Sequence, residues 1–515
     1  MRTGFPRASG ILLHPTSFPG FWGIGDLGAA AYEFIDFLHD GGQRLWQILP
    51  LVPTGLGNSP YQSPSAFAGN PLLISPDRLL QDGLLKRNDL YQTDGQPVRH
   101  FSPDRVAYDA AAEFKMPLLN RAFERFQQGH GRPHHTPETL AAFRHEHSAW
   151  LEDYTLFMAI REHLNDAPLD QWSHDIRTRN PEVIAQLRRD LAERIEFRTF
   201  VQYLFFGQWS ELKAYANKCD VKIIGDAPIF VAYDSADVWA NPDLFYLDDE
   251  GRPTVVAGVP PDYFSEDGQL WGNPLYRWDR MAERGYVWWT QRLTHTLKMV
   301  DILRLDHFRG FEAYWEIQAD ETTAKNGKWV QGPGAALFRV VKRELGDLRI
   351  IAEDLGLITP EVRALRDKFD MPGMKILQFA FGDNAHNPYL PHNYLSNSVV
   401  YTGTHDNNTT VGWFTELTEA QRERVRGYLG HDAHDIAWDL IRLAYASVAN
   451  MVVVPLQDVL RLGSEARQNV PGVMGDGNWT WRYQAGVLEP GVAKGLHFFT
   501  RMYGRDWTER TGYEN

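Results

Sequence analysis

The chain has 515 residues, 43% of them hydrophobic and 23% charged, which is typical of a folded globular protein and excludes a disordered chain. Its net charge of −14, without a run rich in Lys and Arg, argues against a nucleic-acid partner. It contains one cysteine, Cys219, and no uncharged apolar run approaching about 18 residues. We therefore expect a cytoplasmic protein without an intrachain disulfide, a cysteine-based metal cluster or a membrane span.

Short apolar runs rich in Ile, Val and Leu recur along the chain, and several end in Pro, Gly, His or a carboxylate. Such runs, separated by helical segments, are typical of a parallel sheet covered on both faces. Eight of them predict an α/β fold, the (β/α)8 TIM barrel. In chain order they are "GILLH" (10–14), "RLWQILPL" (44–51), "VKIIGDAP" (221–228), "VDILRLDH" (300–307), "RIIAED" (349–354), "MKILQFAF" (374–381), "SVVYTGTHD" (398–406) and "NMVVVPLQD" (450–458).

The spacing between these runs is uneven, and a long structureless loop is improbable in a compact domain. Helical patterns after the second run predict a mainly helical insertion over 56–215. A segment rich in Pro, Gly and aromatic residues after the third run predicts a loop-rich insertion over 227–295. Because loops that follow barrel strands lie on the active-site face, we expect this second insertion to cover the cleft. The whole of 1–515 then forms one catalytic barrel, with too short a tail for a C-terminal β-sandwich.

Carboxylates stand at the ends of three predicted strands. Strand alternation places Arg304 and Asp306 on one face, where the arginine lowers the pKa of the carboxyl group and keeps it ionised. Glu353 ends the next run without a basic residue on its own face, which favours a raised pKa and suits a general acid. Asp406 ends a later run, directly after His405. Since barrel strands bring their carboxyl ends to one face, we expect the three carboxylates to lie together.

Such a triad serves two chemistries. Three ionised acids can hold Mg²⁺, as in enolase-type enzymes, or two acids can cleave a glycosidic bond while a third grips the sugar. The unequal surroundings of the carboxylates and an aromatic content of 13% favour sugar chemistry. A noncatalytic glucan-binding protein would use the same aromatic residues and would show binding without turnover.

Long motifs extend this interpretation over nearly the whole chain. They are "GILLHPTSFPG" (10–20), "SPYQSPSAFAGNPLLI" (59–74), "IIGDAPIFVAYDSADVW" (223–239), "GVPPDYFSEDGQLWGNPLYRW" (258–278), "LRLDHFRGFEAYW" (303–315), "IIAEDLG" (350–356), "YTGTHDNNT" (401–409) and "QDVLRLGSEARQN" (457–469). In this order they resemble the amylomaltase family, also called 4-α-glucanotransferases or disproportionating enzymes, which are relatives of the α-amylases with a retaining mechanism.

The resemblance implies an activity. Members of this family move α-1,4-glucan segments of maltodextrin, starch or glycogen from a donor to the 4-hydroxyl of an acceptor, and they need no metal or organic cofactor. Asp306 is implied to be the nucleophile, Glu353 the general acid/base and Asp406 the stabiliser of the transition state. The alternative within the same chemistry is an α-1,4-glucan hydrolase of the α-amylase type.

The resemblance also implies residues that bind maltooligosaccharides. Arg304 and His405 hold the reacting glucose and the nucleophile, Asp226 hydrogen-bonds sugar hydroxyls, and Tyr61 and Trp271 stack on neighbouring glucose units.

Two positions depart from the family pattern. Leu56 stands where some relatives carry an aromatic residue that helps to form a remote second glucan site, so we do not expect that site to be complete. Asn408 stands where the pattern has an aspartate, a change close to Asp406 that we expect to alter the hydrogen bonding of the loop and leave the chemistry intact.

Overall fold

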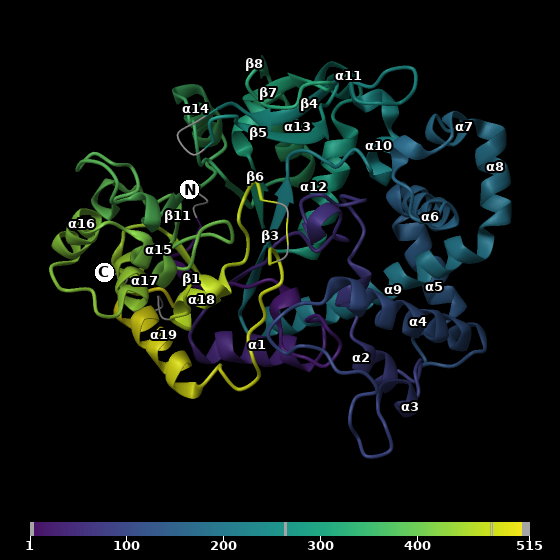
Figure 1. Ribbon diagram of the computed structural model, residues 1–515, viewed down its shortest axis with the longest axis horizontal. Coiled ribbons are helices and arrows are strands. Elements are labelled where there is room, and N and C mark those ends of the chain that lie inside the picture. The colour runs from purple at the N-terminus through teal and green to yellow at the C-terminus, as the bar shows by residue number, and fades with distance from the viewer. Residues whose placement is uncertain (1–4, 262–264, 474, 476, 507–515) are drawn as a thin grey trace.

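The computed structural model describes residues 5–261, 265–473, 475 and 477–506 (Figure 1). Eight parallel strands close into a barrel in the order β1-β12-β11-β10-β9-β6-β3-β2. Every predicted run contributes one of them, so the (β/α)8 barrel is confirmed. The strands are β1 (Ala8–Leu12), β2 (Leu45–Gln47), β3 (Lys222–Pro228), β6 (Ile302–Asp306), β9 (Ile350–Ala352), β10 (Gly373–Ile376), β11 (Ser398–Tyr401) and β12 (Met451–Pro455).

Successive side chains of the barrel strands face the interior and the covering helices in turn. Ile302 of β6 belongs to an interior cluster together with Val453 of β12. Leu303 and Leu305 belong to a second cluster, which joins the outer face of the strands to the helices. Arg304 therefore points into the barrel, as the alternation along the strand predicts.

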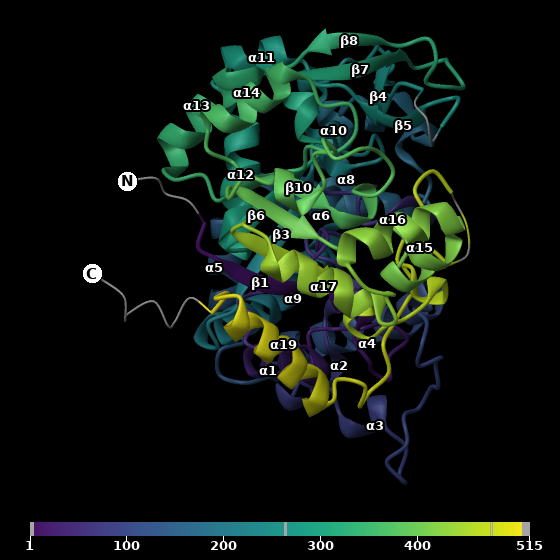
Figure 2. The same ribbon diagram turned by 90° about the vertical axis from the view of Figure 1, so that its left-hand side faces the viewer.

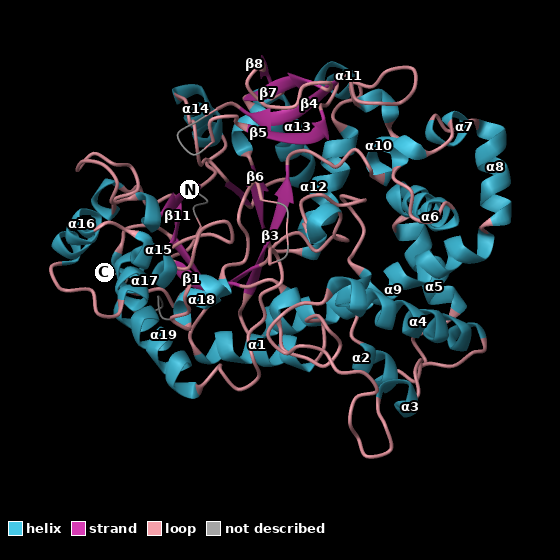
Figure 3. Cartoon of the chain, in the orientation of Figure 1, coloured by secondary structure: helices cyan, strands magenta, loops and turns pink. Residues whose placement is uncertain are grey.

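Most of the helices that cover the barrel directly precede or follow its strands (Figures 1 and 3). They are α1 (Ala29–Asp40), α9 (Ala192–Lys218), α12 (Val287–Met299), α13 (Gly334–Leu345), α14 (Pro360–Lys368), α15 (Thr410–Glu416), α16 (Glu419–Leu429), α17 (Ile436–Ala446), α18 (Leu456–Val459) and α19 (Pro490–Met502). None of the helices in the described part of the chain is long and apolar enough to span a membrane.

The segment between β2 and β3 is built from helices, which gather on one flank of the barrel in Figure 3. Besides α9 they are α2 (Pro76–Gln81), α3 (Arg87–Leu90), α4 (Tyr108–Gln127), α5 (Pro137–Glu146), α6 (Ser148–His163), α7 (His174–Arg177) and α8 (Pro181–Asp190). They occupy the range 56–215 in which a helical insertion is predicted.

A small antiparallel sheet lies beyond one end of the barrel, and both views place it there (Figure 2). Its order is β5-β4-β7-β8. The range 227–295, predicted to be rich in loops, supplies two of its strands and three helices. These are β4 (Val255–Val259), β5 (Gln269–Pro274), α10 (Ala236–Ala240), α11 (Trp278–Glu283) and α12.

The other two strands of this sheet follow β6 and were not predicted. They are β7 (Ala313–Gln318) and β8 (Lys328–Gln331). Because β4 pairs with β7, the segments that follow the third and fourth barrel strands form one unit.

Candidate active site

Arg304 bridges two carboxylates inside the barrel. Its Nη2 atom lies 2.9 Å from Oδ1 of Asp306, and its Nη1 atom lies 2.6 Å from Oδ2 of Asp226. The second contact follows from the register, in which Asp226 of β3 is directly opposite Arg304 of β6. The guanidinium is buried, so it balances two negative charges in a poorly hydrated place. The prediction that Arg304 and Asp306 share a face is confirmed.

Glu353 is held against the end of β6 by backbone groups. Its backbone N–H donates to the carbonyl of Leu305 at 3.0 Å. Its Oε2 atom accepts a hydrogen bond of 2.7 Å from the N–H of His307, and its Oε1 atom accepts one of 2.8 Å from the N–H of Leu355. His307 has a left-handed backbone, with φ of 52°, which turns the chain immediately after Asp306. The turn thus brings Glu353 to the residue that follows the predicted nucleophile.

Asp406 lies in a loop and not at the end of a strand. β11 ends at Tyr401, because the next residues form a turn in which the N–H of Asp406 donates to Oγ1 of Thr404 at 3.2 Å. Two residues from the segment after β12 fix the loop. Asn469 donates to Oδ1 of Asp406 at 2.7 Å, and Arg467 donates to its carbonyl oxygen at 2.6 Å. The Asp406 side chain keeps 41% of its surface exposed, so it is open to a ligand.

Tyr61 connects the two sides of the site. Its hydroxyl donates to Oδ2 of Asp226 at 2.8 Å and lies 3.0 Å from Nε2 of His405. Because the hydroxyl proton goes to Asp226, the contact with His405 requires that Nε2 carries a hydrogen. Burial lowers the pKa of His405, which is consistent with a neutral ring. That Nε2 atom is also 3.4 Å from Oδ2 of Asp406, so polar contacts run from Asp406 through Tyr61 to Arg304.

The aromatic residues predicted to stack on sugars already have neighbours in the protein. The ring of Tyr61 lies parallel to that of His405, with centroids 5.4 Å apart and an angle of 10° between the planes. The ring of Trp271 on β5 meets that of His307 edge-on at 4.8 Å, and its Nε1 atom donates to Gln269 at 3.1 Å. Trp271 is only half-buried, so it retains surface beside the turn that follows Asp306.

Asp226, which we predicted to hydrogen-bond sugar hydroxyls, uses one of its two oxygens for contacts within the protein. Its side chain is 0% exposed, and Oδ2 accepts hydrogen bonds from both Arg304 and Tyr61. A sugar hydroxyl would have to displace one of these donors to reach that oxygen. In this geometry Asp226 orients Arg304 and Tyr61, and its contact with a sugar stays a prediction.

The acidity of the site differs from the sequence-based prediction in one respect. Although 28% of the Asp306 side chain is exposed, the surrounding protein desolvates its carboxyl group. Arg304 opposes this effect, but desolvation and the negative charges of Asp226, Glu353 and Asp406 raise the pKa of Asp306 to about 8. Arg304 does lower the pKa of Asp306, as expected, but the expectation of a low net pKa was wrong, because desolvation outweighs the arginine.

Glu353 has a raised pKa, as predicted. Burial is the main cause, and it outweighs the opposite effects of Arg304 and of the two backbone N–H donors. Since the negative charge of Glu353 is one of the causes that raise the pKa of Asp306, a proton on Glu353 favours ionised Asp306. The two carboxyl groups therefore titrate as a pair.

Sequence reasoning missed Asp458, although it ends the eighth run just as the other carboxylates end theirs. It is buried, and it accepts hydrogen bonds from the hydroxyl of Thr402 at 2.5 Å, the hydroxyl of Thr410 at 2.7 Å and the N–H of Thr410 at 2.6 Å. These contacts close the loop that carries His405 and Asp406. Asp458 thus supports the site through the loop that carries His405 and Asp406.

The two positions that depart from the family pattern differ in their exposure to solvent. Leu56 is on the surface, with 69% of its area exposed. Asn408 is buried, and it donates to Oε1 of Glu416 at 2.7 Å and to Oγ of Ser464 at 2.9 Å. Asn408 therefore anchors the loop to α15 and to the segment after β12.

A closed (β/α)8 barrel with three carboxyl groups around one buried arginine defines an enzyme with acid chemistry at the carboxyl ends of its strands. The sequence profile of the family described as 4-alpha-glucanotransferase matches residues 13–488. The chain belongs to this family, and the resemblance seen in its motifs is confirmed.

Comparisons with individual relatives support the same family. The chain is 51% identical to a 4-alpha-glucanotransferase from Synechocystis over 97% of this chain and 98% of the relative. It is 50% identical to one from Thermus thermophilus over 94% and 96%. A solved structure of amylomaltase from Streptococcus agalactiae in complex with acarbose superposes with a TM-score of 0.92, at 42% identity, over 97% of this chain and 99% of that one. These findings favour a transferase over the α-amylase type of hydrolase.

Proposed function

We propose that the chain is a 4-α-glucanotransferase that moves α-1,4-glucan segments from a donor to the 4-hydroxyl of an acceptor with retention of configuration. Its family and its nearly full-length relatives support the activity. The observation that carries the mechanism is the linked group of carboxylates, in which Arg304 contacts Asp306 and backbone N–H groups hold Glu353 beside it. Maltooligosaccharides are the substrates, and the cytoplasm, with its reducing conditions, suits the single cysteine.

In the first step Asp306 attacks the anomeric carbon while Glu353 protonates the leaving glycosidic oxygen. The bond to the leaving glucan breaks, and a β-linked glucosyl-enzyme forms. Arg304 favours the charge on Asp306, to which it lies 2.9 Å away, and the raised pKa of Glu353 favours the proton there. Attack requires that the single proton of the pair lies on Glu353, where it also removes one of the negative charges that raise the pKa of Asp306.

In the second step Glu353 takes the proton from the 4-hydroxyl of the acceptor, whose oxygen displaces Asp306 from the anomeric carbon. Two inversions give net retention. Asp406 and the neutral His405 face the reacting sugar and stabilise its positive charge and its hydroxyl groups. Trp271, beside the turn after Asp306, offers a face for a neighbouring glucose unit.

Transfer requires that an acceptor sugar outcompete water at the intermediate. The insertion over 227–295 supports this, because β5 carries Trp271 to the turn that follows Asp306. We infer that this segment covers the cleft and lowers the access of water to the glucosyl-enzyme.

Incubation with maltotriose tests the proposal. A transferase converts it into glucose and a ladder of longer maltooligosaccharides, whereas a hydrolase gives shorter products alone. Asp306→Asn is the matched control, since it keeps the size of the side chain and removes the nucleophile. It should bind maltotriose and form neither set of products. Shortened products alone from the unaltered enzyme would contradict the proposal.

A further inference from the structure

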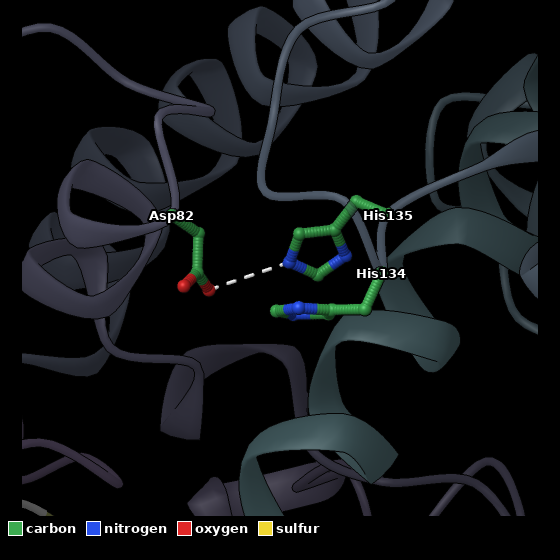
Figure 4. A group of neighbouring side chains, drawn as sticks. All are labelled: Asp82, His134 and His135. Atoms are coloured by element: carbon green, nitrogen blue, oxygen red, sulfur yellow. Dashed lines mark hydrogen bonds and ion pairs between the residues drawn. The ribbon is translucent and has the colours of Figure 1, made fainter.

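A cluster of two histidines and an aspartate lies in the helical insertion, on elements that the proposed reaction does not use (Figure 4). Asp82 follows the last residue of α2, and His134 and His135 lie in the loop between α4 and α5. A nitrogen of each ring and a carboxylate oxygen of Asp82 all lie within 4.8 Å of one another. Figure 4 shows both rings projecting from their loop toward the carboxylate.

Two glycines lie where the end of α2 approaches the loop between α4 and α5. Gly83 follows Asp82, and the position of its missing Cβ is 3.9 Å from the Cα of Gly131. Gly131 is itself 3.2 Å, measured in the same way, from Cβ of His135. Both glycines have positive φ values, 76° and 119°, which side-chain-bearing residues rarely adopt. The backbone conformation of the two loops at the cluster therefore favours glycine at both positions.

Hydrogen bonds orient the more buried ring, that of His135. Its Nδ1 atom lies 3.1 Å from the hydroxyl of Tyr203 on α9, and that hydroxyl donates to the carbonyl of His134 at 3.1 Å. When the tyrosine proton goes to this carbonyl, Nδ1 of His135 is the donor and Nε2 carries a lone pair. Nε2 is the atom that points at Asp82, 3.4 Å from Oδ2. This is the arrangement by which proteins fix a metal-binding imidazole.

We propose that Asp82, His134 and His135 form a zinc site that ties the loop between α4 and α5 to the end of α2. Two imidazoles and a carboxylate suit Zn²⁺ and not the hard cations Mg²⁺ or Ca²⁺, which prefer oxygen. Ligands of a tetrahedral zinc lie about 3.4 Å apart, so small rotations of the side chains complete the site. A water molecule takes the fourth position, because the His134 ring is exposed.

One neighbour weakens the site. Nε of Arg132 lies 3.2 Å from Oδ1 of Asp82, so a positive charge stands beside the carboxylate. The other oxygen, Oδ2, is the one that faces His135 and remains for the metal. The side chains of Asp82 and His135 are 11% and 8% exposed, which keeps the competition from water low.

Isothermal titration calorimetry with ZnCl₂ tests the site. The protein is the full chain without an affinity tag, treated beforehand with a chelator. We expect one Zn²⁺ per chain at this site, and loss of affinity by at least about 10-fold in each of Asp82→Asn, His134→Ala and His135→Ala. His130→Ala is the matched control, since His130 is exposed on the same loop and lies outside the cluster, and it should bind like the unaltered chain. Bound Co²⁺ should give the visible absorption of a four-coordinate ion, and Asp82→Asn should remove it.

Transfer activity on maltotriose serves as the check of folding, since none of the three ligands belongs to the cleft. Two results would overturn the proposal. One is the absence of Zn²⁺ binding by the unaltered, active chain, which would leave the cluster as an ion pair between Asp82 and His135. The other is undiminished binding in all three ligand variants, which would place the metal elsewhere.

Discussion

The hydroxyl of Tyr61 donates a hydrogen bond of 2.8 Å to Asp226, and this contact joins the segment after the second barrel strand to the end of the third. The same tyrosine lies parallel to the ring of His405. Its position therefore orients Asp226, and through it Arg304, and also His405, besides the stacking on a sugar that we propose.

Tyr61→Phe separates these two tasks, because it keeps the ring and removes the hydroxyl. We expect kcat on maltotriose to fall about 10-fold, with little change in KM, since one hydrogen bond to a charged group is lost. Tyr61→Leu, which also removes the ring, should raise KM in addition. An unchanged kcat with a raised KM in the phenylalanine variant would mean that Tyr61 acts by stacking alone.

Arg304→Gln should lower kcat/KM by about 100-fold or more, because it removes charge-assisted contacts to both Asp226 and Asp306. Arg304 lowers the pKa of Asp306 and of Glu353, so its loss should move both limbs of the pH profile to higher pH. Profiles of kcat/KM between about pH 5 and pH 9 measure this shift. A uniform loss with both limbs in place would argue that Arg304 acts only through geometry.

Glu353→Gln removes the proton donor and leaves the nucleophile. We expect turnover of maltotriose to fall by about 100-fold to 10,000-fold. An α-maltosyl fluoride releases fluoride without protonation, so Asp306 should still form a maltosyl-enzyme from it, which accumulates. Mass spectrometry of the intact chain detects the adduct. Asp306→Asn is the control and should form none, and equal behaviour of the two variants would contradict their assigned roles.

Asp458→Ala should lower the thermal midpoint, because it leaves the hydroxyl groups of Thr402 and Thr410 and one N–H group without their acceptor. The expected loss of stability is about 2 to 3 kcal/mol. Activity should fall with it, since the same contacts close the loop of His405 and Asp406. Asp458→Asn can still accept hydrogen bonds and should lose less in a thermal scan. Equal thermal midpoints for Asp458→Ala and the unaltered chain would show that other contacts hold the loop.

Asp237 makes stability depend on pH. Burial raises its pKa to about 6 in the folded chain, against about 3.9 in an unfolded one. Between these two values the folded chain holds a proton that the unfolded chain has lost, so this stabilisation declines as the pH rises and is gone above about 6. The difference amounts to about 3 kcal/mol.

Asp237→Asn should remove that contribution while keeping an acceptor for the N–H of Ala66. The thermal midpoint of the variant, compared with that of the unaltered chain at one scan rate, should rise from pH 4 to about pH 6 and then level off. A constant difference over this range would mean that Asp237 titrates normally.

The barrel could be predicted because its strands are buried on both faces and are therefore mostly apolar. The four strands of the small sheet could not, since β8 (Lys328–Gln331) is mostly exposed and β5 contains Gly272. Such strands pair only with each other, across two different insertions. The sequence of one strand alone does not indicate such a pairing between distant segments.

The carboxylates could be predicted for a similar reason, because each stands after an apolar run. What surrounds them could not. Tyr61 and His405 are 344 residues apart, and nothing near either one indicates that they meet. The raised pKa of Asp306 could not be predicted, because its main cause is burial by the folded chain, and because Asp226 and Glu353 come from β3 and from the end of β9, on either side of β6.

The pairing of β4 with β7 has a consequence for how this enzyme can change. Trp271 comes from the segment after the third barrel strand, and the turn it contacts comes from the fourth. If only one of these segments were exchanged to obtain a new acceptor preference, the strand of the other segment would be left with an unpaired edge. The two segments are therefore expected to be inherited, and to be engineered, as a pair.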